Sequence, residues 1–303
     1  MKYFISDPYI KANISINITN MDDDKLRIAH FDITSMVSDP AIVMIAKRGS
    51  GKSWVIRDIV SQYKHIPVGV IIAPTDEMNG FYKSFFPDLF IHHDVDPKLL
   101  ANILKRQNVM TCNYIRMQEE LKQGKKVKAV DPSLILIMDD CLADAKDWKK
   151  DPTVTAILLN GRHYHFTFVL TMQDPIGVPP MLRMNFDYYF ILGEDSQINV
   201  EKIYKNFASI FPNLYTFKKT FAELTADFGV MVINNRLKDT DITKKVYYYK
   251  AVERKFMFGS KQFVGFHNKY YDKNYKMRQL LDDKGLDLSK FNSRNGGLVI
   301  EKV

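Results

Sequence analysis

The chain alternates between short apolar runs and segments that carry apolar residues at helical spacing. Apolar runs of strand length, rich in branched and aromatic residues, lie within 41–53, 68–77, 133–144, 153–174 and 185–193. Such runs are typical of strands buried in a parallel sheet. The stretches between them place apolar residues three or four positions apart, as amphipathic helices do. The alternation predicts an α/β fold, with a mostly parallel sheet and helices on both faces.

Weaker patterns predict the remaining elements. Residues 13–19 alternate apolar and polar side chains, as a half-buried strand would, and 27–34 are its expected partner. Residues 96–110 and 111–126 read as two amphipathic helices. Two closing strands are expected at 229–235 and 244–251, the second at an edge of the sheet. We therefore divide the chain into an N-terminal arm (1–39), a central domain (40–251) and a C-terminal extension (252–303).

The first apolar run ends in a glycine-rich turn, A-K-R-G-S-G-K-S, at residues 46–53. A strand, a tight glycine turn and a helix are the context of a phosphate-binding P-loop (Walker A), although the same pattern also fits a purely structural turn. The glycines would let the backbone approach phosphates, Lys52 would reach the β- and γ-phosphates, and the Ser53 hydroxyl would bind Mg²⁺. Ala46 replaces the usual first glycine. The predicted nucleotide-binding residues are Ala46, Arg48, Gly49, Ser50, Gly51, Lys52, Ser53 and Trp54.

Two carboxylates follow the apolar run within 133–144. Asp139 and Asp140 stand at the tip of a predicted buried strand, which is typical of a Walker B element. Asp139 would hold the Mg²⁺ shell, and Asp140 would orient and polarise the attacking water. The alternative is that Asp140 caps the start of the next helix. With a P-loop upstream, the pattern favours Mg²⁺–ATP chemistry.

The strand within 153–174 offers two further candidates. Gln173 stands at the carboxyl end of this strand, where a polar side chain can touch the γ-phosphate or the lytic water. Arg162 leaves the preceding helix just before the strand begins. An isolated arginine at this position is ordinarily a surface residue or a helix C-cap.

The distribution of charge and the number of cysteines indicate which partners and which kinds of scaffold the chain can have. The formal net charge is +8, and 244–278 hold ten Lys or Arg and two acidic residues, interleaved with aromatic residues. This basic-aromatic segment suits a nucleic-acid surface, or else a strand and a solvated helix whose aromatic rings pack on the domain. The two cysteines exclude a disulfide scaffold. No apolar run has membrane-spanning length, so we expect no membrane span.

Four stretches in order resemble one family. They are A-K-R-G-S-G-K-S, L-I-L-I-M-D-D, N-G-R-H-Y-H-F-T-F-V-L-T-M-Q-D-P and M-L-R-M-N-F-D-Y-Y-F-I-L, within about 41–192. Together they are similar to the genome-packaging ATPases of the nucleo-cytoplasmic large DNA viruses, the poxvirus type included, in the FtsK–HerA superfamily. Three features distinguish this family from other P-loop NTPases. They are the Arg-His before the strand, the Thr-x-Gln at its end and the Asn-Phe-Asp-Tyr-Tyr-Phe strand.

The resemblance implies a RecA-like P-loop NTPase that uses ATP and Mg²⁺ to move double-stranded DNA. It implies a homo-oligomeric ring, a pentamer or hexamer, docked at a capsid vertex or portal. It also implies that Arg162 acts as an arginine finger on a neighbouring subunit, and that Gln173 is a sensor. The expected location is the viral factory in the host cytoplasm, with the virion as a second site. The alternatives are another nucleic-acid motor, such as a helicase or DNA-transfer pump, a P-loop small-molecule kinase, and a non-enzymatic capsid-associated DNA-binding protein.

Overall fold

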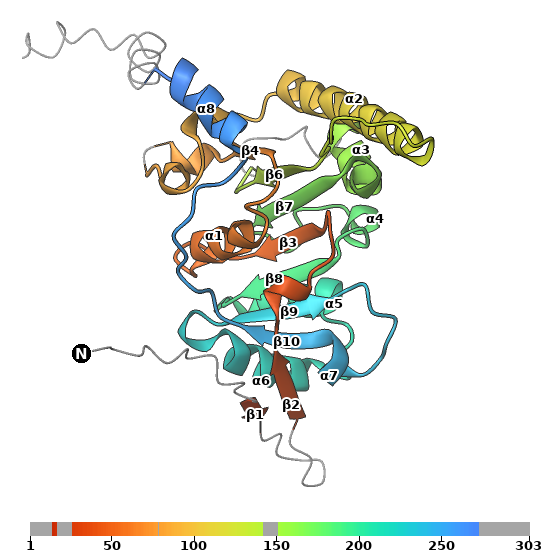
Figure 1. The fold of residues 1–303 in the computed structure, drawn as a ribbon. Coiled ribbons are helices and arrows are strands. Elements are labelled where there is room, and N and C mark those ends of the chain that lie inside the picture. The colour runs from red at the N-terminus through yellow and green to blue at the C-terminus, as the bar shows by residue number, and fades with distance from the viewer. Residues whose placement is uncertain (1–13, 17–25, 78, 142–150, 273–303) are drawn as a thin grey trace, which may run out of the picture.

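A computed structural model describes residues 14–16, 26–77, 79–141 and 151–272. Its centre is a ten-stranded sheet with the order β1-β2-β10-β9-β8-β3-β7-β6-β4-β5 (Figure 1). Six of the nine neighbouring strand pairs are parallel and three are antiparallel. The predicted fold class, a mostly parallel sheet with helices on both faces, is therefore confirmed.

Parallel strands make up the half of the sheet that carries the candidate chemistry. Every residue of β6 and β7 is buried, as their nearly unbroken apolar sequences require. β7 lies between the strand before the glycine-rich turn and the strand before the two aspartates, so the carboxyl ends of all three meet at one edge. The strands of this half are β3 (Ala41–Ile45), β4 (Val68–Ile72), β5 (Ile91–His92), β6 (Leu134–Met138), β7 (Phe166–Met172) and β8 (Tyr188–Leu192).

The other half of the sheet contains β9 (Val230–Asn234), β10 (Val246–Tyr249), β2 (Leu26–His30) and β1 (Ile14–Ile16). The predicted pairing of the two N-terminal strands is confirmed, because β1 pairs antiparallel with β2. The prediction that the second closing strand lies at an edge was wrong. β10 is enclosed by β9 on one side and by β2 on the other. The N-terminal β2 thus extends the same sheet as the central domain.

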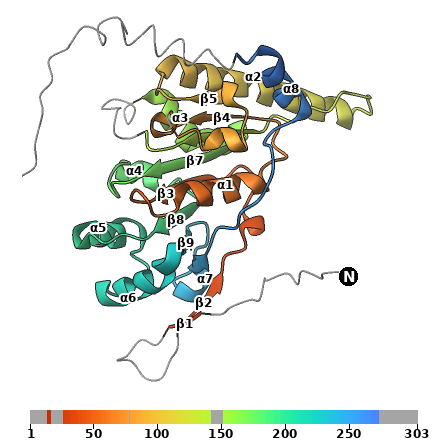
Figure 2. The ribbon, with the colours of Figure 1, turned by 90° about the vertical axis from the view of Figure 1, so that its left-hand side faces the viewer.

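Helices cover both faces of the sheet (Figure 2). α1 (Lys52–Gln62) packs on one face, together with α8 (Lys261–Tyr270). The opposite face is covered by α2 (Pro97–Lys122), α3 (Pro152–Asn160), α5 (Gln197–Phe207) and α6 (Leu214–Thr225). The short helices α4 (Pro180–Arg183) and α7 (Ile242–Lys245) complete the described part. No described helix is both long and apolar enough to cross a membrane.

The two helices predicted for 96–110 and 111–126 are one helix. α2 runs without interruption for 26 residues, from the Asp96 N-cap to Lys122. No glycine or proline stands between its first turn and Gly124, so nothing breaks the chain of hydrogen bonds at residue 110.

The aromatic residues of the basic-aromatic segment mostly pack on the domain where the structure describes them. Tyr249, Phe258 and Phe263 are buried. The ring centroids of Phe258 and Phe86 lie 4.7 Å apart, and those of Phe263 and Phe90 lie 4.0 Å apart. This part follows the packing interpretation. The residues from 273 onward lie outside the described part.

Candidate active site

The glycine-rich turn has the backbone that a phosphate cradle needs. β3 is followed directly by buried Ala46, whose N–H donates to the carbonyl of Met172 on the neighbouring strand. Gly49 and Gly51 have φ angles of +77° and +93°, a region that glycine enters without steric cost. Gly51 is the N-cap of α1, so the turn lies at the partly positive end of that helix. This arrangement is suited to an anionic group such as phosphate.

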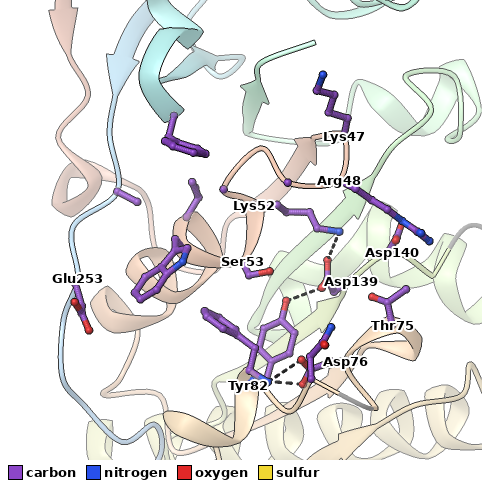
Figure 3. A pocket seen from close by; sticks show the side chains of 18 of the residues that line it. Lys47, Arg48, Lys52, Ser53, Thr75, Asp76, Tyr82, Asp139, Asp140 and Glu253 are labelled. Atoms are coloured by element: carbon purple, nitrogen blue, oxygen red, sulfur yellow. Dashed lines mark hydrogen bonds and ion pairs between the residues drawn. The ribbon is translucent and has the colours of Figure 1, made fainter. Parts of the chain in front are cut away.

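A cavity of about 1140 Å³ opens over the turn (Figure 3). Its lining comes from the P-loop and the first turn of α1, from the carboxyl ends of β4 and β6, and from two segments late in the chain, 228 and 250–253. Lys52, Ser53, Asp139 and Asp140 all line it. The cavity therefore joins the two strongest sequence motifs in one space.

Asp139 is the centre of a buried network. Lys52 Nζ lies 2.9 Å from Asp139 Oδ1, which also accepts a 2.6 Å hydrogen bond from the Thr171 hydroxyl. The Tyr82 hydroxyl donates to Asp139 Oδ2 at 2.8 Å. Burial first, and then the Asp139 carboxylate, raise the pKa of Tyr82 well above its ordinary value. Tyr82 therefore stays protonated and serves as a fixed donor that orients the carboxylate.

Asp76 supports this network from β4. It follows the strand in the 3₁₀ turn Pro74–Asp76, and its carboxylate accepts hydrogen bonds from the backbone N–H groups of Phe81 (2.8 Å) and Tyr82 (3.3 Å). Burial raises the pKa of Asp76. The side chain thus holds the turn that carries Tyr82 against Asp139.

Asp140 has a backbone that only a few residue types tolerate. Its φ is +54°, a conformation that costs roughly 1–3 kcal/mol in a non-glycine residue. The Asp140 N–H donates to Thr171 Oγ1 at 2.9 Å, and Asp140 Oδ2 accepts a 2.6 Å hydrogen bond from Gln173 Nε2. Thr171 therefore links both aspartates, and Gln173 aims the second carboxylate. The alternative role of Asp140 as a helix cap concerns 142–150, which lie outside the described residues.

The oxygen donors suit a Mg²⁺ ion that is shared with a nucleotide. The described residues contain no cluster of three or more His, Cys, Asp or Glu side chains that could hold a metal by themselves. Mg²⁺ usually keeps several water ligands and takes one or two protein oxygens plus phosphate oxygens. Ser53 and Asp139, which both line the cavity, would supply the protein oxygens. The ion would neutralise charge on the β- and γ-phosphates.

Comparisons with known proteins place the chain among viral proteins. No protein-family model matches it. It is 49% identical over 265 residues to "Uncharacterized protein L437" of Acanthamoeba polyphaga mimivirus, a match that covers 86% of this chain and 91% of that protein. It is 30% identical over 253 residues to "Uncharacterized protein 075L" of Invertebrate iridescent virus 6, covering 80% and 91%. The chain belongs to this family of large DNA virus proteins. The relatives come from large DNA viruses, the class of virus that the motifs predicted.

The solved structures that resemble this protein do so only distantly. "Structure of the genome packaging NTPase B204 from Sulfolobus turreted icosahedral virus 2 in complex with AMP" has 13% identity and a TM-score of 0.47, covering 72% of this chain and 100% of that chain. "EssC (ATPases 2 and 3) from Geobacillus thermodenitrificans" has 11% identity and a TM-score of 0.48, covering 86% and 47%. The fold assignment therefore rests on the strand order and the glycine-rich turn of the chain itself.

Most of the predicted site residues lie together in this family member. Arg48, Gly49, Gly51, Lys52, Ser53, Trp54, Asp139 and Asp140 line the cavity. Three others have different places. Ala46 is buried at the end of β3, Ser50 donates to the carbonyl of Lys47 at 2.7 Å, and Gln173 reaches the site through Asp140.

Arg162 lies apart from the other predicted residues. It belongs to the 3₁₀ turn Gly161–Tyr164, which precedes β7, so it is at the opposite edge of the sheet from the P-loop. The seven residues of β7 separate the two edges by roughly 20 Å. Its guanidinium contacts the buried carboxylate of Asp187 in the same chain. Within one chain, the structure does not bring Arg162 to the nucleotide site.

Several residues of the site carried no assigned role in the sequence. Tyr82 contacts a residue 57 positions away, and no local periodicity signals such a contact. Phe228 reaches the cavity from the turn that precedes β9. Thr171 did carry a signal, because the Thr-x-Gln pattern ending β7 placed its side chain, like that of Gln173, at the strand edge beside the aspartates.

Substituting the two aspartates tests their predicted roles. Asp140→Asn keeps an oxygen that can accept from Gln173, so we expect ATP affinity within about threefold of wild type. Hydrolysis should fall by at least about 100-fold, because the general base is lost. Asp139→Asn should be at least as severe. Steady-state phosphate release and isothermal titration of ATP measure the two effects, and a milder effect of Asp139→Asn would reverse the roles.

Proposed function

We propose that this protein is a Mg²⁺-dependent ATPase that drives double-stranded viral DNA into a capsid. The observation that carries the proposal is the network at the carboxyl edge of β3, β7 and β6, in which Lys52 pairs with Asp139 and Thr171 links Asp139 to Asp140. Phosphoryl transfer needs mainly positioning and charge neutralisation, and this network supplies both. Lys52 would neutralise phosphate charge while Asp140, aimed by Gln173, would orient the attacking water.

Family membership and the distribution of charge support double-stranded DNA as the polymer that the motor moves. The chain belongs to a family of large DNA virus proteins, and its positive charge is concentrated in 244–278. Lysine and arginine side chains neutralise DNA phosphates without reading sequence. A packaging motor needs this property, because it must move along any sequence. We further propose that the active form is a ring of five or six subunits docked on a capsid vertex, in the viral factory and the virion.

The purified full-length chain provides the test. ATP hydrolysis should rise several-fold when linear double-stranded DNA is added, and the protein should displace a triplex-forming third strand without separating the duplex. Asp140→Asn is the matched control, since it should keep the fold and lose both activities. Separation of the duplex would indicate a helicase instead. Transfer of the γ-phosphate to a small acceptor would indicate a kinase, and hydrolysis indifferent to DNA would contradict a DNA motor.

A further inference from the structure

The cavity extends well beyond the phosphate cradle. Figure 3 places Glu253 on the side of the P-loop that faces away from Asp139 and Asp140. Further lining comes from three separate segments, the first turn of α1, the turn before β9 and the segment after β10. It comprises Trp54, Val55, Phe228, Lys250, Ala251 and Glu253. None of the catalytic roles discussed above uses the later residues of this set.

Phe228 is presented to the cavity in a strained backbone. Asp227 and Phe228 are consecutive non-glycine residues with φ angles of +48° and +59°. The Phe228 side chain does not offset this cost by burial, since the residue is 61% exposed. The turn is closed by Gly229, where a Cβ would come within 2.2 Å of the Leu224 carbonyl. The Phe228 ring lies against the P-loop, 3.4 Å from the position that a Cβ on Gly51 would take.

Residues 249–254, which form the wall of the cavity beside Phe228, are hydrogen-bonded to α1, the helix that follows the P-loop. The buried carboxylate of Asp58 on α1 accepts hydrogen bonds from the Tyr249 hydroxyl (2.5 Å), the Val252 N–H (2.7 Å) and Arg254 Nε (2.8 Å). These three bonds hold 249–254 against α1 on both sides of the cavity-lining Lys250 and Ala251. Lys250 Nζ in turn lies 2.6 Å from Asp227 Oδ2. The wall and the Phe228 turn are therefore held in a defined position relative to the P-loop.

The orientation of a bound nucleotide follows from the P-loop. The backbone of such a loop holds the α- and β-phosphates, while Lys52 and the carboxylate edge fix the γ end. The nucleoside must then leave on the side away from Asp139, where Glu253 lies and where Phe228, Lys250 and Ala251 also line the cavity. Aromatic side chains can stack on any nucleobase, because every base has a π-face.

We propose that this end of the cavity is the nucleobase subsite, where Phe228 stacks on the adenine of ATP against a wall formed by Ala251 and Glu253. The proposal rests on the nucleotide-binding function proposed above. Phe228 is a binding residue here and takes no part in the transfer itself. The carboxylate of Glu253 can accept a hydrogen bond from an amino group of the base.

Binding measurements on the full-length chain separate the base from the phosphates. Phe228→Ala should weaken ATP about tenfold or more, as expected for the loss of one base–aromatic stack. Inorganic tripolyphosphate, which has no base, should bind this variant within twofold of wild type. Phe228→Trp should retain ATP affinity. Tyr215→Ala, which removes another exposed aromatic residue, located on α6, is the matched control and should change neither ligand.

Each other outcome has a distinct meaning. Unchanged ATP affinity in Phe228→Ala would overturn the subsite and leave the ATPase proposal intact. Equal weakening of ATP and tripolyphosphate would show that Phe228 only supports the P-loop, which also overturns it. A wild-type chain that binds neither ligand would overturn the proposed function and the subsite together. Thermal melting of each variant identifies any loss of folding.

Discussion

Lys52→Ala is expected to abolish ATP hydrolysis, with a loss of at least about 100-fold, while the protein still folds. In a P-loop the lysine reaches the β- and γ-phosphates, and removing one charge-stabilising donor typically costs a factor of this size. The fold should survive because Asp139 keeps its hydrogen bonds from Thr171 and Tyr82. Phosphate-release kinetics and thermal denaturation measure the two properties separately.

A surface lysine provides the control for this experiment. Lys64 is exposed just after α1, and its replacement by alanine should leave turnover unchanged. Normal turnover in well-folded Lys52→Ala protein would refute the P-loop assignment. It would leave the glycine-rich turn with only a structural role.

Arg162→Ala is expected to bind ATP nearly normally and yet hydrolyse it poorly even in the assembled ring. A guanidinium is always charged and can donate two hydrogen bonds to a phosphate. In GTPases an arginine supplied by a partner is worth about 10³–10⁵ in rate. Arg162 lies at the sheet edge opposite its own P-loop, so we expect it to act on the nucleotide of a neighbour rather than on its own.

The contacts of Arg162 would allow its side chain to leave Asp187 and turn toward the nucleotide of a neighbouring subunit. Its side chain is 52% exposed although it contacts buried Asp187. Arg236 Nη1 lies 2.9 Å from the same carboxylate oxygen, and the other oxygen accepts from the Ala41 N–H at 2.9 Å. Asp187 would therefore remain paired if Arg162 turned toward a neighbouring subunit. The substitution of Arg162 should accordingly cost little stability.

Mixed assemblies test action between subunits. Arg162→Ala and Lys52→Ala should each be inactive alone but recover some activity when mixed, because an intact P-loop can then face an intact Arg162. Arg236→Ala is the matched control, since it loses the same Asp187 contact without losing the proposed finger. If co-assembled mixtures show no recovery, or if Arg236→Ala is equally inactive, Arg162 has only a structural role.

The next candidate would then be an arginine nearer the cavity. Arg48 is exposed and lines the cavity in the P-loop itself. Arg183 is a weaker choice, because it is buried and its Nε donates to the Val178 carbonyl at 2.7 Å.

The sequence by itself determined the parallel strands, the P-loop and the meeting of the P-loop with Asp139, Asp140 and Gln173. These features are local. Each buried strand is a nearly continuous apolar run, and the glycines and carboxylates follow such runs closely. Because parallel strands place their carboxyl ends at one edge, residues that follow different strands converge without further information.

Only the tertiary structure decided what depends on contacts between distant segments. The Tyr82 donor to Asp139, the position of Phe228 beside Gly51 and the ion pair of Arg162 with Asp187 join residues far apart in the chain. β10 became an inner strand because β2, from the N-terminal arm, pairs with it. Periodicity reports which side of an element is buried, but not which distant segment covers it. The partner is chosen by packing and hydrogen bonding across the whole sheet.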